Sequence, residues 1–304
     1  MTDSTTDPIV DALRSNRHPE RPHYALGTLL TADDFLAEQT YHRARLARLL
    51  AYLFGPGTVA GLRALFKPAT PAALRDPDLD EVHVNPGLAL DAYGRLIEVP
   101  RLSCVRLRKW FNAQDAGRRA ISVQQYADAH PDQPPDAHAI AWLFLRFHPY
   151  PDQVTPVLAA GPFDATNSVA PARTRDGHEL RLFLAGAADE PTFPRVGTTG
   201  ADRLIPRPAP QLPSAGSDRI AALHEHILDR WEQPTPSEKP PGADGWLLLA
   251  RVDIPTVQNG AVHEYDEAHP ESVLVDNYVR PFVHGAAALA LHTALPQLAR
   301  TPTL

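Results

Sequence analysis

Fourteen histidines make metal binding the first chemistry to test in this sequence. His224 and His226 stand two residues apart in a predicted helix, about 200° around its axis, so they cannot chelate one ion together. Residues 263–269 combine two histidines with acidic side chains, but the spacing does not place both imidazoles on one helical face. We expect a solvated loop there and no metal site, and keep hydrolase chemistry in this segment as an alternative function.

Nucleophilic and phosphate chemistry finds little support. Cys104 is the single cysteine, which rules out an internal disulfide, and its apolar and basic strand pattern shows no catalytic partner. The glycines at 55–61 close a helix and open a strand, whereas a dinucleotide fingerprint follows a strand and opens a helix. No Gly-x-Ser-x-Gly elbow or Walker lysine loop occurs. The sequence therefore predicts no catalytic residue, no cofactor and no enzyme.

Three arginines form the charged cluster with the clearest binding chemistry. Arg173, Arg175 and Arg181 lie before and along a predicted strand, and planar guanidinium groups bind carboxylates in a bidentate fashion. They could hold a carboxylate or phosphate ligand, although such charges more often pair across strands or subunits. We predict that these three arginines contribute to contacts between subunits.

The element nearest the N-terminus that could carry such contacts is a long helix predicted over 31–54. Thr31 is its N-cap candidate, with Asp34 as an acidic capping-box partner, and Gly55-Pro56-Gly57 ends it. About 24 residues make a rod of roughly 36 Å, too long for a small β unit to cover. We therefore predict a homo-oligomer in which a neighbouring chain or another domain partly buries the leucines of its C-terminal half: Leu46, Leu49, Leu50 and Leu53.

After the helix, the apolar period falls from 3.6 to 2, which is typical of strands. We predict an antiparallel β unit over 58–110, with strands at 58–66, 81–85, 88–91, 95–99 and 104–110. A polar connection over 112–137 contains a short helix at 123–129. A second β unit over 139–253 has strands at 139–147, 179–184 and 245–253. Further helices are expected at 218–231 and within 285–300, and proline-rich linkers at 191–213 and 234–242.

The predicted fold class is α+β with mainly antiparallel sheets. The 32 prolines argue against a helical bundle, because proline removes a backbone donor and fixes φ. The elements divide the chain into an N-terminal arm with the long helix (1–57), a first β unit with its connection (58–137) and a second β unit with linkers and a C-terminal helix (138–304).

Net charge and hydropathy exclude some classes of binding partner. The net charge of −7 leaves no sequence-wide basic field for nucleic acid or an anionic membrane. The first residues are polar rather than signal-like, and the longest apolar stretches are interrupted by charged residues or proline, so neither a secretory signal nor membrane insertion is expected. We expect a cytoplasmic location during assembly.

Several motifs resemble a bacterial family associated with contractile injection clusters, which encode phage-tail-like particles. Residues 24–42 read Tyr-x-x-Gly-x-Leu-Leu-x-x-Asp-Asp-Phe-x-x-Glu-Gln-x-Tyr-His, 55–62 read Gly-x-Gly-Thr-Val-x-Gly-Leu, and 84–95 read Val-x-Pro-Gly-Leu-Ala-Leu-Asp-x-x-Gly-Arg. Weaker similarity lies at 142–147, 173–180 and 246–252. The elements around 55–95 also look like those of phage baseplate and fibre-associated proteins.

This resemblance implies a non-enzymatic structural component of a contractile injection particle, associated with the baseplate, the cage or the attachment of fibres. Its implied partners are baseplate, sheath or fibre proteins, and the particle could be released from the cell with this chain in it. Besides the hydrolase, one other alternative is a glycan- or receptor-binding module, for which Trp110, Trp231 or Trp246 would need to be exposed.

Overall fold

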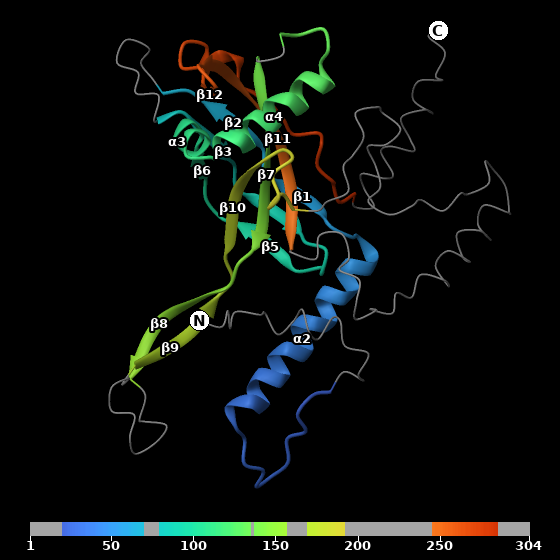
Figure 1. The fold of residues 1–304 in the computed structure, drawn as a ribbon. Helices are drawn as coiled ribbons and strands as arrows, with labels where there is room; N and C mark the ends of the chain where they lie inside the picture. Colours follow the sequence, from blue (N-terminus) through green and yellow to red (C-terminus); the bar gives the residue numbers. More distant parts are fainter. Residues whose placement is uncertain (1–19, 70–78, 135–136, 157–168, 192–244, 285–304) are drawn as a thin grey trace, which may run out of the picture.

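A computed structural model describes residues 20–69, 79–134, 137–156, 169–191 and 245–284 (Figure 1). A β-rich body carries two projecting elements: the helix α2 (Ala32–Leu53) and a hairpin of β8 (Tyr150–Pro156) and β9 (Val169–Arg175). The pairs of neighbouring strands described in the sheets are all antiparallel. The predicted α+β class with mainly antiparallel sheets is confirmed.

The first β unit is two three-stranded sheets rather than one. One sheet has the order β1–β4–β5 and the other β2–β3–β6. The single strand predicted over 58–66 is therefore wrong, because Leu62 has a φ of 56° and the chain there passes from one sheet to the other. The strand bounds are β1 (Gly57–Gly61), β2 (Ala64–Lys67), β3 (Glu81–Val84), β4 (Gly87–Leu90), β5 (Leu96–Val99) and β6 (Ser103–Arg106).

A buried arginine from the far end of the described chain holds the bend at Leu62. Arg280 is only 2% exposed, and its guanidinium donates to the Leu62 carbonyl at 2.7 Å and to the Asn277 carbonyl at 3.0 Å. Burial is the main reason that the pKa of Arg280 falls to about 10. Asn277 adds bonds to both the amide and the carbonyl of Ala64. The C-terminal part of the body thereby fixes the path between β1 and β2.

The largest sheet contains the predicted second β unit. Its order is β10–β7–β11–β12, and β13 (Leu274–Asp276) also pairs with β11. The predicted strands 139–147 and 179–184 are both present and pair with each other, with Leu182 opposite Leu143. The strand predicted to end at 253 continues to Asn259, because its outer part pairs with β12. The bounds are β7 (His138–Phe147), β10 (His178–Leu184), β11 (Trp246–Asn259) and β12 (Val262–Tyr265), followed by a 3-10 turn η3 (Pro270–Ser272).

The helices between the two β units differ from the prediction. The expected strand over 104–110 ends at Arg106, and α3 (Leu107–Asn112) follows because Leu107 and Phe111, four residues apart, both enter the core. The helix expected at 123–129 begins earlier, as α4 (Ala116–Ala129), where the Asp115 carboxylate caps the amides of Gly117 and Arg118. The helices predicted at 218–231 and within 285–300, and the linkers at 191–213 (except Pro191) and 234–242, lie outside the described residues.

Strand β7 is the centre of the core and is buried on both faces. Leu143 and Leu145 belong to a cluster that also takes in Leu62 and Ile97 of the first β unit. Phe144 faces a second cluster, to which α4 contributes Tyr126. The two predicted β units, 58–137 and 138–304, thus share one hydrophobic core. Within the described ranges, every helix is too short or too polar to cross a membrane.

Candidate interaction site

Hydrogen bonds of a capping box hold the first turn of helix α2. The Thr31 amide and hydroxyl both donate to the Asp34 carboxylate, at 2.7 and 2.8 Å, which confirms the predicted capping box. These hydrogen bonds lower the pKa of Asp34. The Tyr24 hydroxyl donates to Glu38 at 2.5 Å, and this bond raises the pKa of Tyr24. The segment before the helix is therefore tied to its first turns.

The joint between α2 and the body depends on a glycine. Gly94 has a φ of 77° in the β4–β5 turn, and a Cβ atom there would overlap the Ala47 carbonyl oxygen and the Ala51 amide nitrogen of α2. Asp91 fixes the turn, since its buried carboxylate accepts the backbone amide of Arg95 at 2.9 Å and the guanidinium Nε at 2.5 Å. The helix thus approaches the body through its alanine side.

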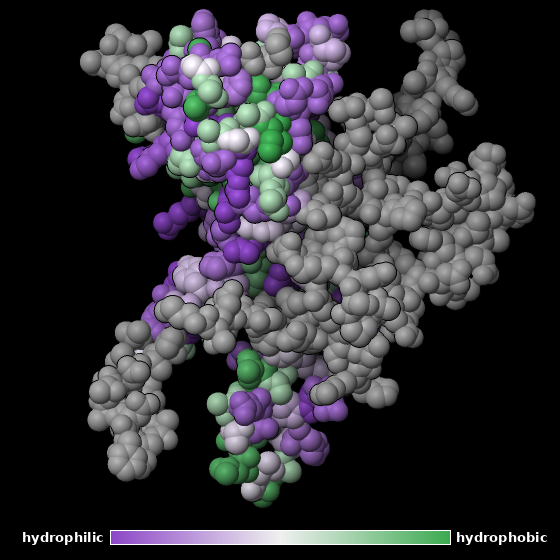
Figure 2. Space-filling model, viewed as in Figure 1, coloured by the Kyte–Doolittle hydropathy of each residue, from purple (hydrophilic) through white to green (hydrophobic). Residues whose placement is uncertain are grey.

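The leucine side of α2 faces away from the body. Leu46, Leu49 and Leu53 are 59%, 54% and 62% exposed, and Leu50 is half-buried. Figure 2 shows further apolar surface at the other, N-terminal end of the projecting helix, farthest from the body. Of these four leucines, Leu50 alone is partly covered by the residues that the structure describes. Burial of the leucines by a neighbouring chain or another domain stays a prediction.

The hairpin β8–β9 is the second projection, and ion pairs connect it internally and to α2. Asp152 lies opposite Arg173 in the strand register, yet its carboxylate pairs with Arg175, with 2.6 Å between Oδ2 and Nη2. Arg43 of α2 pairs with Asp176, which follows β9, at 3.7 Å. Because both side chains of this second pair are well exposed, it contributes little stability.

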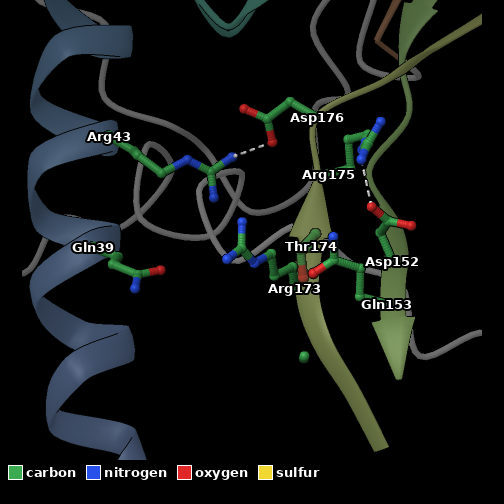
Figure 3. A pocket seen from close by; sticks show the side chains of 9 residues that line it. Gln39, Arg43, Asp152, Gln153, Arg173, Thr174, Arg175 and Asp176 are labelled. Carbon is green, nitrogen blue, oxygen red and sulfur yellow. Dashed lines mark hydrogen bonds and ion pairs between the residues drawn. The ribbon is translucent and has the colours of Figure 1, made fainter. Parts of the chain in front are cut away.

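A polar cavity of about 770 Å³ lies between α2 and the hairpin (Figure 3). Figure 3 shows Gln39 and Arg43 on the helix facing Asp176 and Arg173 on the hairpin side. Arg173 makes no ion pair with any residue that the structure describes, and its guanidinium can accept a carboxylate from another molecule. The lining residues are Gln39, Arg43, Asp152, Gln153, Ala172, Arg173, Thr174, Arg175 and Asp176.

The structure brings together two of the three predicted arginines. Arg173 and Arg175 line the cavity, whereas Arg181 lies on β10, 3.8 Å from Asp189 and over the ring of Phe183. Sequence reasoning missed Arg43 and Asp152 as part of this site. No spacing in the sequence links Arg43 to a hairpin more than 100 residues away.

Residues 263–269 are not the solvated loop that the sequence predicted. His263 and Tyr265 belong to β12, and Tyr265 is buried with its hydroxyl donating to Asp80 at 2.9 Å. Asp266 accepts a hydrogen bond from His269 at 2.8 Å on the surface, which lowers the pKa of Asp266 and raises that of His269. No group of three or more potential metal ligands occurs among the described residues.

The other candidate residues take structural positions or keep a low reactivity. Trp110 and Trp246 are half-buried against the two core clusters, and Trp231 lies outside the described residues. Neither Trp110 nor Trp246 therefore presents a fully exposed ring on which a glycan could stack. Cys104 is exposed on β6, where partial burial and the nearby Glu81 carboxylate raise its thiol pKa. Such a thiol stays protonated, which disfavours a nucleophilic role.

Comparison with known proteins leaves the family open. No protein-family model matches this chain, and no curated protein matches it.

Proposed function

We propose that this chain is a non-enzymatic structural subunit of a contractile injection particle, placed at the baseplate, the cage or a fibre attachment. In this proposal it assembles in the cytoplasm, and the particle can carry it out of the cell. The β body is the folded platform, and α2 with the β8–β9 hairpin contacts neighbouring baseplate, sheath or fibre subunits.

One observation supports this proposal above the others: α2 turns its leucine face away from the body. Leu46, Leu49 and Leu53 stay more than half exposed, unlike the leucines of the core cluster. Exposed large apolar side chains gathered on one projecting element are typical of surfaces that bind another protein. The cavity beside α2 adds Arg173, which can bind a carboxylate of the same neighbour.

Incorporation into particles tests the proposal. Particles purified from cells expressing the wild-type chain should contain it at a fixed copy number by quantitative mass spectrometry. The double variant Leu46→Asp/Leu49→Asp should fold as the wild type and be lost from particles, because charges on these exposed positions oppose burial at an interface. Ala32→Asp/Ala37→Asp, on exposed positions of α2 outside this leucine face, adds the same two charges as a control and should retain most incorporation.

Absence of the wild-type chain from intact particles would refute the proposed function. If both double variants were incorporated as efficiently as the wild type, the particle role would stand and the contact through the leucine face would be wrong.

A further inference from the structure

The exposed residues of α2 follow the spacing of a coiled-coil seam. Steps of four and three residues alternate along the whole helix, which is the 3.5-residue repeat of positions a and d in a heptad. Every member of this seam is exposed in the structure. The seam consists of Phe35, Gln39, His42, Leu46, Leu49 and Leu53.

The seam is distinct from the side that packs on the body. Ala47, the buried residue of α2, is one position after Leu46 and therefore lies about 100° around the helix axis. Docking onto the Gly94 turn uses this alanine side. Leu46, Leu49 and Leu53 of the seam stay exposed, and Gln39 borders the polar cavity beside the hairpin. The 22 residues of α2 make about 33 Å of helix, or three heptads, for a second helix to pack against.

We propose that the seam of α2 binds the same seam of a second copy of this chain, as a parallel coiled coil. The inference rests on the proposed role as an assembly subunit and identifies one partner in that assembly.

The order of residues in the seam matches a parallel pair. In a parallel arrangement each residue meets its own copy, so Leu46, Leu49 and Leu53 form apolar layers and Gln39 and His42 form polar ones. An antiparallel arrangement that overlaps over the whole seam would place Leu46 against His42 and Leu49 against Gln39. Apolar layers at one end and polar layers at the other therefore favour the parallel register.

The flanking charges are complementary in the same register. Glu38 precedes a seam residue and Arg43 follows one, five positions later, which is the g-to-e′ spacing of salt bridges between parallel helices. Among the described residues, Arg43 pairs with Asp176 at 3.7 Å and Glu38 accepts the Tyr24 hydroxyl at 2.5 Å. Both contacts are exposed, so both side chains can also reach a partner helix. Arg45 and Leu50 occupy the equivalent positions one heptad on, where the arginine stem can cover the half-buried leucine.

Disulfide trapping in the full chain tests both the partner and the direction. Cys104→Ser removes the exposed native thiol, and Leu46→Cys or Ala37→Cys then places one thiol on the seam or on another exposed face of α2. Under mild oxidation, we expect covalent dimers of the Leu46→Cys chain at several times the yield of the Ala37→Cys chain. Equal yields from the two variants would overturn the proposal.

A mixture of His42→Cys and Leu46→Cys chains, both with Cys104→Ser, separates the two directions. A parallel pair predicts dimers of like chains. Predominant mixed dimers, which would join position 42 to 46, would refute the parallel register.

A variant that should strengthen dimerisation gives a result that misfolding cannot produce. Gln39→Leu replaces a polar layer by an apolar one at an exposed position, and we expect the dissociation constant of the dimer to fall about tenfold in sedimentation analysis. No change in this constant would contradict the seam. A chain that dimerises through the seam but is absent from particles would refute the proposed function alone, whereas a particle subunit without seam dimers would refute this inference alone.

Discussion

The core strand β7 and the helix α2 place their leucines in opposite environments. In the body, Leu143 and Leu145 of β7 are fully buried between strands and covering helices. In α2, Leu46 and Leu53 are about as apolar but more than half exposed, and the helix packs on the body through alanines instead. The apolar content of a segment alone therefore does not show whether it belongs to the core. Helix α2 docks through the side on which its alanines and the Gly94 turn of the body let the two backbones approach closely.

The largest effect should come from truncating a leucine in the body. Leu143→Ala removes buried methyl groups from β7 and should lower the free energy of unfolding by about 2–5 kcal/mol. The same change in the helix, Leu46→Ala, should stay within about 0.5 kcal/mol in the isolated chain, because that side chain is mostly in water already. Urea unfolding of both variants measures the contrast. A similar loss for both would mean that the body covers the α2 leucines in solution.

The joint between body and helix should give the next effect. Gly94→Ala adds a Cβ atom that collides with the backbone of α2, and it also strains a residue at a φ of 77°. We expect faster amide hydrogen exchange throughout α2 and a loss of about 1–3 kcal/mol in stability, while β7 remains protected.

Gly27→Ala is the matched control for this joint. Gly27 has a φ of 86° but no atom within 4 Å of an added Cβ, so it isolates the backbone strain from the collision. Equal effects on exchange in α2 from both variants would show that Gly94 does not hold the helix to the body.

A smaller change in stability, which depends on pH, should come from His178 of β10. Burial lowers the pKa of His178, whose Nε2 lies 3.1 Å from the Ser103 hydroxyl, so the folded chain favours the neutral imidazole. As the pH falls below about 6.5, the unfolded chain binds a proton first, and the stability contributed by neutral His178 is lost. The urea midpoint should drop between about pH 7.5 and about pH 5.5, and less so for His178→Gln. An identical drop in this variant would assign the pH dependence to other groups.

The elements that the sequence predicted well are those whose signals are local. The capping box at Thr31 and Asp34 marks the start of α2, and the apolar run at 142–145 marks a strand buried on both faces. The Asp91–Gly94 turn also follows from its residues, since glycine there accepts a positive φ.

The sequence could not predict features that depend on contacts between distant residues. The break between β1 and β2 is held by Arg280, more than 200 residues away from Leu62. Residues 104–110 fit a strand by alternation, but Leu107 and Phe111 fit a helix turn equally well, and the core decides between them. In the candidate site, Arg173 and Arg175 were predicted from their chemistry, while Arg43 joined them only through the placement of the hairpin beside α2.

Thiol labelling before and after assembly shows whether α2, rather than the body, makes the contact with other subunits. In a Cys104→Ser chain, a cysteine at Leu46 should react readily with a maleimide in the isolated protein, because this position is 59% exposed. Once the chain is in particles, we predict that Leu46→Cys becomes protected while Ala37→Cys on the same helix stays reactive. Equal and undiminished labelling of Leu46→Cys in intact particles would contradict the account.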